Sequence, residues 1–561
     1  MFLPSIQGTF RGIRDLRRAQ TILGVLVSYG FGWLVERITP GWRAKKAYPL
    51  EEDVTKLTPP QRVRRMMEAL GPSFIKLGQM LSSRPDLVPP DYAEEFKHLQ
   101  AHTTPFPYHQ VKEIIQREFN QPVENLFQEF EVKPFSAASI SQVHRAVLHS
   151  GERVVVKVQR PNIEHLMMSD ISIVRRLAEL IEKLDLYELS HYNLTGIVDE
   201  FEKVTRRELD FTVEGKNGDR FRANFAGNPA VYFPKVFWER TTERVLTVEE
   251  IRGQHLSEVT HLLPSEKRTI TTQLAQLSLT QLFKHGFFHA DPHHGNIFLL
   301  PDNVIVLIDF GMTGRIDYMM MDRLADLFLG VMDQDAHMCA RVVVEVGDPN
   351  GNVEIDHHRL RLDIADMLDR HASGSLDQLN INQIITETLN TIRKYRLKPP
   401  PELVLMSRAL LTLEGVAHDF YPEFNLFEEL IPFAKEIIAR RYSPKRLVKN
   451  AGYTAYDVSQ LLQILPYELR QLLRKFRQGS IRQEIELRDL RKILSELELI
   501  TTRLVFGMIL SALIIGFSLI FASGKISGVL DLFTSIGSIG FLIVTVLGLW
   551  LIISILRGGK I

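Results

Sequence analysis

One short polar stretch and the tripeptide that follows it constrain the fold of this chain more than any other feature. The stretch is His289-Ala290-Asp291-Pro292-His293-His294-Gly295-Asn296, and thirteen residues after Asn296 the chain reads Asp309-Phe310-Gly311. A His-x-Asp with an Asn five residues after the Asp, and then an Asp-Phe-Gly just after a predicted strand, is the signature of kinase-type phosphoryl transfer. The sequence therefore predicts a kinase-like site.

Each polar residue of this signature has a predicted role. Asp291 is the catalytic base, or the group that orients the attacking oxygen. Asn296 and Asp309 are the predicted ligands of Mg²⁺, a hard cation that prefers oxygen donors, and the phosphoryl donor would be ATP. A zinc site made by the three histidines of the stretch is the alternative. It leaves Asn296 and the Asp-Phe-Gly unexplained.

A kinase-like site also needs a lysine on a strand to contact phosphate. Lys157 stands in the β-branched run Val154-Val155-Val156-Lys157-Val158, and it precedes Asp291 by 134 residues. The ordinary interpretation of such a lysine is an exposed position at a sheet edge. Because the lysine comes before the Asp at about the spacing of kinases, the sequence favours a catalytic role for Lys157.

The glycine-rich loop that covers phosphate in protein kinases is missing before Lys157. A segment of small residues takes its place, and residues 134–144 read PFSAASISQVH. Alanine has less φ freedom than glycine, so this loop should be stiffer. We expect the linker at Glu249 and Ile251 to present backbone groups to adenine. The nucleotide contacts predicted in the loop are Ser136, Ala137, Ala138, Ser139, Ile140, Ser141 and Gln142.

Two long uncharged runs near the C-terminus predict a membrane anchor. Residues 504–524 and 532–556 contain no charged side chain, and a short polar turn separates them. About 20 apolar helical residues span the hydrocarbon core, so these runs predict a transmembrane helical hairpin. A buried helix pair in a soluble core is the alternative. Basic residues on both flanks, among them Arg503 and Arg557, predict that the catalytic domain is cytoplasmic.

The N-terminal segment also combines basic and apolar residues. Four arginines lie between Arg11 and Arg18, and residues 19–35 then carry no charge. The segment lacks a small-residue cleavage site and its arginines lie too far along the chain for a secretory signal. We expect an amphipathic helix in the membrane interface. The alternatives are a short third membrane segment and a surface helix packed on the main domain.

Composition excludes several other classes of protein. The chain has 67 Lys+Arg and 67 Asp+Glu, so its formal net charge is +0, which argues against nucleic-acid binding by bulk charge. Hydrophobic residues are 45% and charged residues 24%, as in a globular protein. The single cysteine, Cys339, excludes an internal disulfide, a CxxC redox pair and a cysteine-cage zinc site.

Four segments in order carry a resemblance to a known family: Lys76-Leu77-Gly78-Gln79 (KxGQ), the Ala-rich loop, Glu208-Leu209-Asp210 (ExD) and residues 289–296 (HADPHPGN). Together they resemble the UbiB family of atypical kinase-like proteins, which is named for its role in ubiquinone biosynthesis. The resemblance covers roughly residues 54–315, and the helical region and membrane hairpin after it are typical of bacterial members. Ser136 and Ser141 stand where the family often has Ala and Gly, and His294 where it usually has Pro.

This resemblance implies roles that the residues alone do not. Lys76 and Gln79 would cover the active site beside Glu208 and Asp210, where protein kinases bind a peptide. Glu214 would pair with the strand lysine and so belong to the catalytic set. Without the resemblance, Lys76 is a solvated helix position and Glu208 an ordinary helix ion-pair partner. Members of the family resemble ATPases or small-molecule kinases that act on lipid-linked quinone precursors.

We therefore expect an α+β fold of two lobes, similar to an atypical protein kinase, with helical additions. The predicted parts are a basic interfacial segment (1–49), a KxGQ helical extension (50–130), an N-lobe (131–253), a C-lobe (254–440), a helical linker (441–503) and a transmembrane hairpin (504–556). Within them, we expect Pro59-Pro60 and Pro89-Pro90 to begin helices and residues 304–307 to form a short strand.

The predicted function is that of an ATPase or small-molecule (lipid) kinase that uses ATP and Mg²⁺ and supports isoprenoid-quinone biosynthesis. We expect a multi-pass protein of the bacterial inner membrane, whose partners are membrane lipids, quinone-precursor lipids and other quinone-biosynthesis proteins. One alternative is a nucleotide-gated lipid-binding protein without significant phosphoryl transfer, against which the intact Asp291, Asn296 and Asp309 argue. The other is a soluble phosphotransferase of the antibiotic type, against which the KxGQ segment and the hairpin argue.

Overall fold

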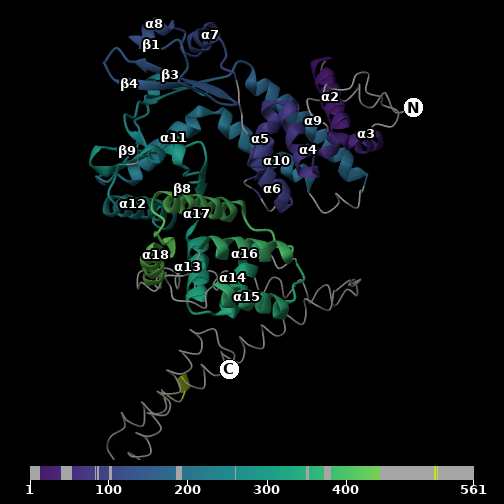
Figure 1. The fold of residues 1–561 in the computed structure, drawn as a ribbon, viewed down its shortest axis with the longest axis vertical. Coiled ribbons are helices and arrows are strands. Elements are labelled where there is room, and N and C mark those ends of the chain that lie inside the picture. The colour runs from purple at the N-terminus through teal and green to yellow at the C-terminus, as the bar shows by residue number, and fades with distance from the viewer. Residues whose placement is uncertain are drawn as a thin grey trace, which may run out of the picture. The chain divides into compact units, whose positions relative to one another are not determined.

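The computed structural model describes residues 13–38, 54–82, 84, 87–99, 104–184, 193–259, 261–348, 353–371, 381–441, 511, 512 and 515. The chain divides into two compact units, residues 1–448 and 449–561, and the elements described below belong to the first (Figure 1). Almost all of the predicted linker (441–503) and hairpin (504–556) lies outside the described residues. Among the helices that are described, none is long and apolar enough to cross a membrane.

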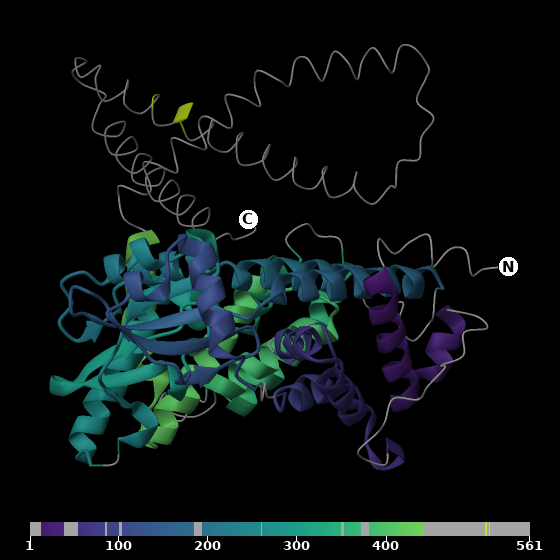
Figure 2. The ribbon, with the colours of Figure 1, turned by 90° about the horizontal axis from the view of Figure 1, so that it is seen from above.

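A group of helices forms one end of the first unit, away from the main sheet in both ribbon views (Figures 1 and 2). Prolines begin α4 and α6, as predicted, since proline fits the first turn of a helix. The group comprises α2 (Ile13–Leu26), η1 (Val27–Phe31), α3 (Gly32–Ile38), η2 (Val54–Lys56), α4 (Pro59–Leu70), α5 (Pro72–Ser82), α6 (Pro90–Phe96), α9 (Ile163–Lys183) and α10 (Leu194–Leu209).

Helix α2 packs on its neighbours through part of the uncharged segment 19–35. Ala19, Ile22 and Val25 are buried in one core with side chains of α4, α5, α9 and α10. Arg18 fixes the helix further, because its Nε lies 2.7 Å from Asp170 Oδ1. Farther along the segment, Trp33 is 46% exposed. The packing of α2 matches the alternative of a helix on the main domain, and a place for the segment in the membrane interface stays a prediction.

A five-stranded antiparallel sheet forms the sheet lobe, with strand order β1-β3-β4-β6 and β2 paired to β3. In β4, Val154, Val156 and Val158 are buried against α7 and α8. Because successive strand residues point to opposite faces, Lys157 faces the other way. The lobe comprises α7 (Tyr108–Phe119), α8 (Val123–Leu126), β1 (Glu129–Phe130), β2 (Ser136–Ala137), β3 (Ser141–Val147), β4 (Arg153–Gln159) and β6 (Val245–Glu249).

The next part of the unit holds two small sheets, one of strand order β5-β10-β9-β7 and one of β8 and β11. Strand β10 matches the strand predicted at 304–307. The elements are α11 (Phe211–Asn224), β5 (Val231–Tyr232), η3 (Trp238–Arg240), β7 (Gln254–His255), η4 (Leu256–Glu258), α12 (Pro264–Phe283), β8 (Phe287–His289), η5 (His294–Asn296), β9 (Ile297–Leu300), η6 (Pro301–Asn303), β10 (Val304–Leu307) and β11 (Thr313–Arg315).

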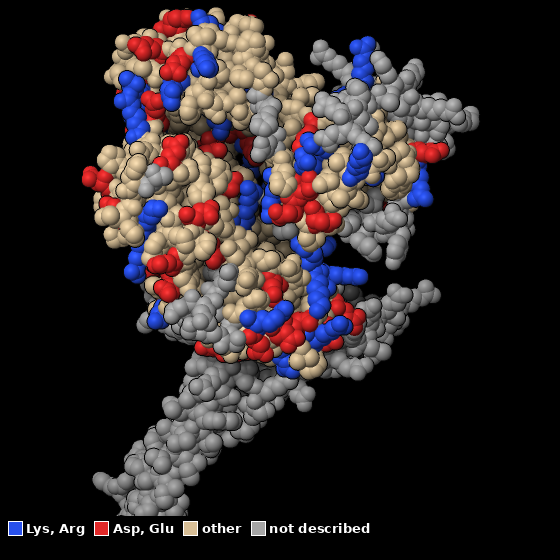
Figure 3. Space-filling view, viewed as in Figure 1, with Lys and Arg blue, Asp and Glu red and all other residues tan. Residues whose placement is uncertain are grey.

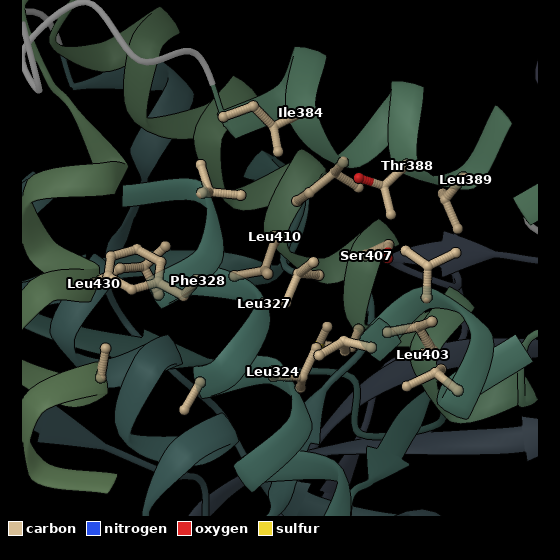
Figure 4. A pocket seen from close by; sticks show the side chains of 18 of the residues that line it. Leu324, Leu327, Phe328, Ile384, Thr388, Leu389, Leu403, Ser407, Leu410 and Leu430 are labelled. Atoms are coloured by element: carbon tan, nitrogen blue, oxygen red, sulfur yellow. The ribbon is translucent and has the colours of Figure 1, made fainter. Parts of the chain in front are cut away.

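Helices follow as far as Arg441 and form the largest core of the first unit together with α12. They surround an apolar cavity of about 130 Å³, in which Thr388 and Ser407 are the only polar side chains among the lining residues (Figure 4). The helices are α13 (Tyr318–Met332), α14 (Ala336–Gly347), α15 (His357–His371), α16 (Ile381–Lys394), α17 (Pro401–Phe420) and α18 (Leu426–Arg441).

Glu414 of α17 gives this helical region an expected pH dependence. Burial raises the pKa of Glu414 to about 7, and its Oε2 has no hydrogen-bond partner within the described structure. The folded state therefore binds a proton that the unfolded chain releases near its ordinary pKa, so this contribution to stability is present at low pH and is lost as pH rises toward 7.

We therefore expect Glu414→Gln to raise the melting temperature relative to wild type at pH 8, and to lose most of that advantage at pH 5. Glu402→Gln, at an exposed position of the same helix, is the control and should show the same offset at both pH values. Differential scanning fluorimetry across the pH range measures both. An equal offset for Glu414→Gln at pH 5 and pH 8 would contradict a buried, protonated carboxyl.

Candidate active site

A cavity of about 790 Å³ lies where the sheet lobe, the N-terminal helices and the region around β8 meet. On the face shown in Figure 3, acidic and basic side chains gather along the hollow between these parts. The cavity brings together residues that are far apart in the sequence. The predicted site residues that line it are Lys76, Gln79, Ala137, Ala138, Ser139, Ile140, Ser141, Lys157, Glu208, Asp210, Glu214, Asp291, Asn296 and Asp309.

Lys157 and Glu214 form an ion pair in this cavity, with 2.8 Å between Nζ and Oε2. Burial lowers the pKa of Lys157, but the carboxylates of Glu214 and Asp309 outweigh burial and raise it overall. Burial also raises the pKa of Glu214, and Lys157 opposes that change. Lys157 is therefore held as a cation, and Glu214 fixes its position.

The junction of two helices explains how Glu214 reaches the lysine. Asp210 caps the start of α11, because the N–H and the hydroxyl of Thr212 donate to Asp210 Oδ1 at 3.0 and 2.7 Å. Glu214 follows one turn later. At the end of α10, Glu208 Oε2 lies 2.8 Å from Lys76 Nζ. The ExD residues thus join the helix that carries Glu214 to the KxGQ helix.

His289 organises the loop that carries Asp291. Its Nδ1 accepts a hydrogen bond from the Asp291 N–H at 3.1 Å, and its Nε2 donates to the Ile308 carbonyl at the same distance. Burial lowers the pKa of His289, which favours this neutral form. The imidazole therefore links the catalytic loop to the end of β10, just before Asp309.

The three histidines of the stretch do not converge on one point. His293 Nδ1 accepts from the Gly295 N–H at 3.0 Å, whereas His294 Nε2 lies 3.1 Å from Asp419 Oδ2. Across the described part of the chain, no group of three or more His, Cys, Asp or Glu side chains is arranged to hold a metal ion. The contacts of the histidines are those of loop-forming residues.

Asn296 and Asp309 fit the role of Mg²⁺ ligands. Asn296 Nδ2 donates to the Asp291 carbonyl at 3.1 Å, which leaves its amide oxygen as the atom suited to a cation. The charge of Lys157 lowers the pKa of Asp309 more than burial raises it, so the carboxylate is ionised. Asp309 also has a positive φ of 58°, and its Oδ1 accepts from the Gly311 N–H. One carboxylate and one amide suit Mg²⁺, which takes its other ligands from phosphate and water.

Four of the predicted nucleotide contacts are not among the residues that line the cavity: Ser136, Gln142, Glu249 and Ile251. Gln142 is fully buried on the opposite face from Ser141, where its amide makes hydrogen bonds with both backbone groups of Phe106. The Glu249 carboxylate accepts from the Tyr232 hydroxyl at 2.7 Å. Strand alternation explains why Gln142 differs from its neighbour, since successive residues of β3 point to opposite faces and Ser141 is the residue of β3 that lines the cavity.

Comparison with known proteins identifies the family. The ABC1 atypical kinase-like domain matches residues 98–343, the UbiB helical domain 364–425 and the ABC1/UbiB kinase-like C-terminal domain 488–557. An uncharacterized protein of Synechocystis is 36% identical over 71% of this chain and 97% of its own length. The chain belongs to the ABC1/UbiB atypical kinase-like family.

Two further relatives agree with this membership in the ABC1/UbiB family. A protein of Clostridium pasteurianum, described as an uncharacterized protein in the hydrogenase 1 5' region, is 31% identical over 97% of this chain and 99% of its own length. A "Probable protein kinase UbiB" of Cellvibrio japonicus is 32% identical over 69% of this chain and 71% of its own length. The family resemblance inferred from the four motifs is therefore confirmed.

The KxGQ motif that is typical of the ABC1/UbiB family lies on α5. Lys76 and Gln79 face the cavity, and Gln79 Nε2 donates to the Leu99 carbonyl at 3.2 Å. Gly78 lies between them, where a Cβ atom would overlap Leu99 Cδ1 and lie 2.7 Å from Met67 Sδ. The glycine therefore permits the close packing of α5 on its neighbours.

Substitution of Gly78 should be destabilising for that reason. Both Gly78 and Gly415 lie inside helices, where Ala is favoured over Gly by about 1 kcal/mol. Gly415→Ala is the control, because a Cβ at this position of α17 meets no atom within 4 Å. We expect the free energy of unfolding of Gly78→Ala to be lower than that of Gly415→Ala by about 1–3 kcal/mol, since the buried side chains of Leu99 and Met67 must shift. Chemical denaturation of both variants measures the difference. Equal stability of the two variants would contradict the packing of α5 described here.

The sequence motifs missed several basic residues of the cavity in this ABC1/UbiB protein. Arg408 of α17 is the most significant of them, because its Nη2 lies 3.1 Å from Asp291 Oδ2. Arg408 lies 99 residues after Asp309, outside every motif used to predict the site, so those motifs gave no signal for it. The basic residues missed are Arg84, Lys97, Arg207 and Arg408.

Proposed function

We propose that this protein is an ATP-dependent phosphotransferase or ATPase of the membrane surface that acts on a lipid-linked quinone precursor. The observation that carries the proposal is the presence of Lys157, Asp291, Asn296 and Asp309 in one cavity. These are the groups that phosphoryl transfer needs, because such catalysis consists of positioning and charge neutralisation.

Each of the main polar residues of the cavity has a distinct proposed role. Lys157 would bind the phosphates of ATP, with Glu214 holding it in place. Asn296 and Asp309 would hold Mg²⁺, which when bound neutralises phosphate charge. Asp291 would orient the acceptor oxygen and take its proton. His289 keeps the Asp291 loop in place through its two hydrogen bonds.

A small acceptor is favoured over a protein acceptor. The α5 helix forms one wall of the cavity, and the Lys76–Glu208 ion pair joins it to α10. An extended peptide would have to displace this wall to reach Asp291. The name of the family and the two uncharged runs at 504–524 and 532–556 support a quinone precursor in a membrane as the acceptor. Attachment by a hairpin would keep the cavity at the surface where such a lipid resides.

The test is phosphate release from ATP by the purified full-length protein in phosphatidylethanolamine and phosphatidylglycerol vesicles. The vesicles are compared with and without a prenylated hydroxybenzoate, and Lys157→Met is the inactive control. We expect Mg²⁺-dependent phosphate release, or transfer to the lipid, that rises with the prenylated compound and is lost in Lys157→Met. ATP binding without any phosphoryl transfer would overturn the proposal in favour of a nucleotide-gated lipid-binding protein.

A further inference from the structure

The catalytic loop of this chain carries no lysine or arginine. Residues 289–296 read HADPHHGN, so the loop itself supplies no permanent positive charge beside Asp291. A cation reaches Asp291 from elsewhere, because Arg408 Nη2 lies 3.1 Å from Asp291 Oδ2. The two side chains are 30% and 22% exposed, and both line the cavity. The pair is thus open to a ligand and is not sealed in the core.

Four other basic residues of the cavity have different partners in the described structure. Lys157 pairs with Glu214, Lys76 with Glu208, Lys97 with Glu94 and Arg84 with Glu200. Each of these four cations is paired with a carboxylate outside the catalytic loop, and Arg207 is exposed on α10. Arg408 differs from them, since its ion pair is with the residue that faces the reacting oxygen in a kinase-type site.

Helix α17 holds Arg408 on a firmly packed support. Pro401, Leu405 and Arg408 face the catalytic cavity, at a spacing that places them on one side of a helix. The opposite side, which includes Leu403 and Leu410, packs in the apolar helical core (Figure 4). The guanidinium is therefore presented by a helix that is anchored along its other face. Such preorganised charge is the most effective kind in catalysis.

We propose that Arg408 is the cation that stabilises the phosphoryl group during transfer, an inference that rests on the proposed function. Without nucleotide, Arg408 pairs with Asp291; with ATP bound, its fork of N–H groups donates to the γ-phosphoryl oxygens. In the step itself, the bond from the γ-phosphorus to the bridging oxygen breaks and its electron pair leaves with ADP. The acceptor oxygen forms the new bond to phosphorus, and its proton passes to Asp291.

This role makes a kinetic prediction for Arg408→Met, which keeps the length of the side chain and removes its charge. We expect kcat for ATP turnover to fall about 100-fold or more, by analogy with arginines that act in the same way in other phosphotransferases, while KM for ATP changes little. Arg408→Lys should retain part of the activity, because it keeps the charge and loses the fork. Lys398→Met, at an exposed cation just before α17, is the matched control and should behave as wild type.

A binding measurement separates this role from a structural one. Wild type should bind Mg²⁺–ADP–aluminium fluoride, which imitates the transferring phosphoryl group, more tightly than Mg²⁺–ADP. Arg408→Met should lose that preference and still bind Mg²⁺–ADP with unchanged melting temperature.

Several results would overturn the inference. If Arg408→Met keeps both the wild-type kcat and the wild-type preference for aluminium fluoride, the inference is wrong. It is also wrong if Arg408→Met turns ATP over faster than wild type, because the Arg408–Asp291 ion pair would then be inhibitory. If Arg408→Met and Arg408→Lys lose ADP affinity and thermal stability to the same extent as each other, Arg408 has only a structural role. If the wild-type protein shows neither ATP turnover nor tighter binding of Mg²⁺–ADP–aluminium fluoride than of Mg²⁺–ADP, the proposed function fails as well. If wild type shows both and Arg408→Met does not differ from it, only the inference about Arg408 fails.

Discussion

Asp291→Asn should bind ATP as wild type does and lose turnover by about 10²- to 10⁴-fold, the usual contribution of a general base. The substitution keeps the shape of the side chain and removes the carboxylate that would take the acceptor's proton. The backbone around it should survive, because His289 contacts the Asp291 N–H and Asn296 contacts its carbonyl. Phosphate release and an ATP-dependent thermal shift, measured on the same preparation, test the two halves of this expectation.

Asp419→Asn is the matched control for Asp291→Asn. Asp419 also joins α17 to the catalytic loop, through His294, but its carboxylate is largely exposed and does not line the cavity. Turnover should therefore be unchanged in this variant. Normal turnover in Asp291→Asn would remove Asp291 from its proposed role. It would leave the fold and the family membership intact.

Asp309→Asn should weaken Mg²⁺-dependent ATP binding on the order of 100-fold, which corresponds to loss of one charged metal contact. Asp309 is ionised beside Lys157 and is the one carboxylate of the Asp-Phe-Gly segment that lines the cavity. Without that charge, the metal would lose a ligand and the negative charge of the phosphates would be less well neutralised. Isothermal titration calorimetry with ATP in Mg²⁺ and in EDTA measures the effect.

The control for Asp309→Asn is Asp302→Asn. Asp302 has a similar positive φ, 62° against 58°, but it lies in the turn before β10 and does not line the cavity. Any change in stability that comes from placing Asn at a left-handed backbone position therefore occurs in both variants. Loss of a metal ligand occurs only in Asp309→Asn. Full Mg²⁺-dependent affinity in Asp309→Asn would contradict the assignment of Asp309 as a metal ligand.

The sequence predicted much of the local structure around the cavity. The β-branched run before Val158 is β4, the apolar run at 304–307 is β10, and the prolines at 59 and 90 begin helices. These segments have strong local signals, either strand propensity or a residue that fits the first turn of a helix. The pairing of Lys157 with Glu214 followed from the family resemblance and not from local pattern.

What the sequence did not show depends on contacts between distant segments. Local pattern gives no sign that Ala19, Ile22 and Val25 share a core with α4, α5, α9 and α10. Gln142 looks like a loop residue until the strand register sends it toward Phe106. Arg408 lies in a helix without a motif, and only the tertiary fold places it beside Asp291.

The most direct test of the central claim is an experimental structure of the full-length protein with Mg²⁺ and a non-hydrolysable ATP analogue. The account predicts that the phosphates lie between Lys157 and Asp309, with the metal bound by Asp309 and Asn296 and the terminal phosphate facing Asp291. A nucleotide bound outside this cavity, or bound within it with its phosphates away from Lys157 and Asp309, would contradict the account.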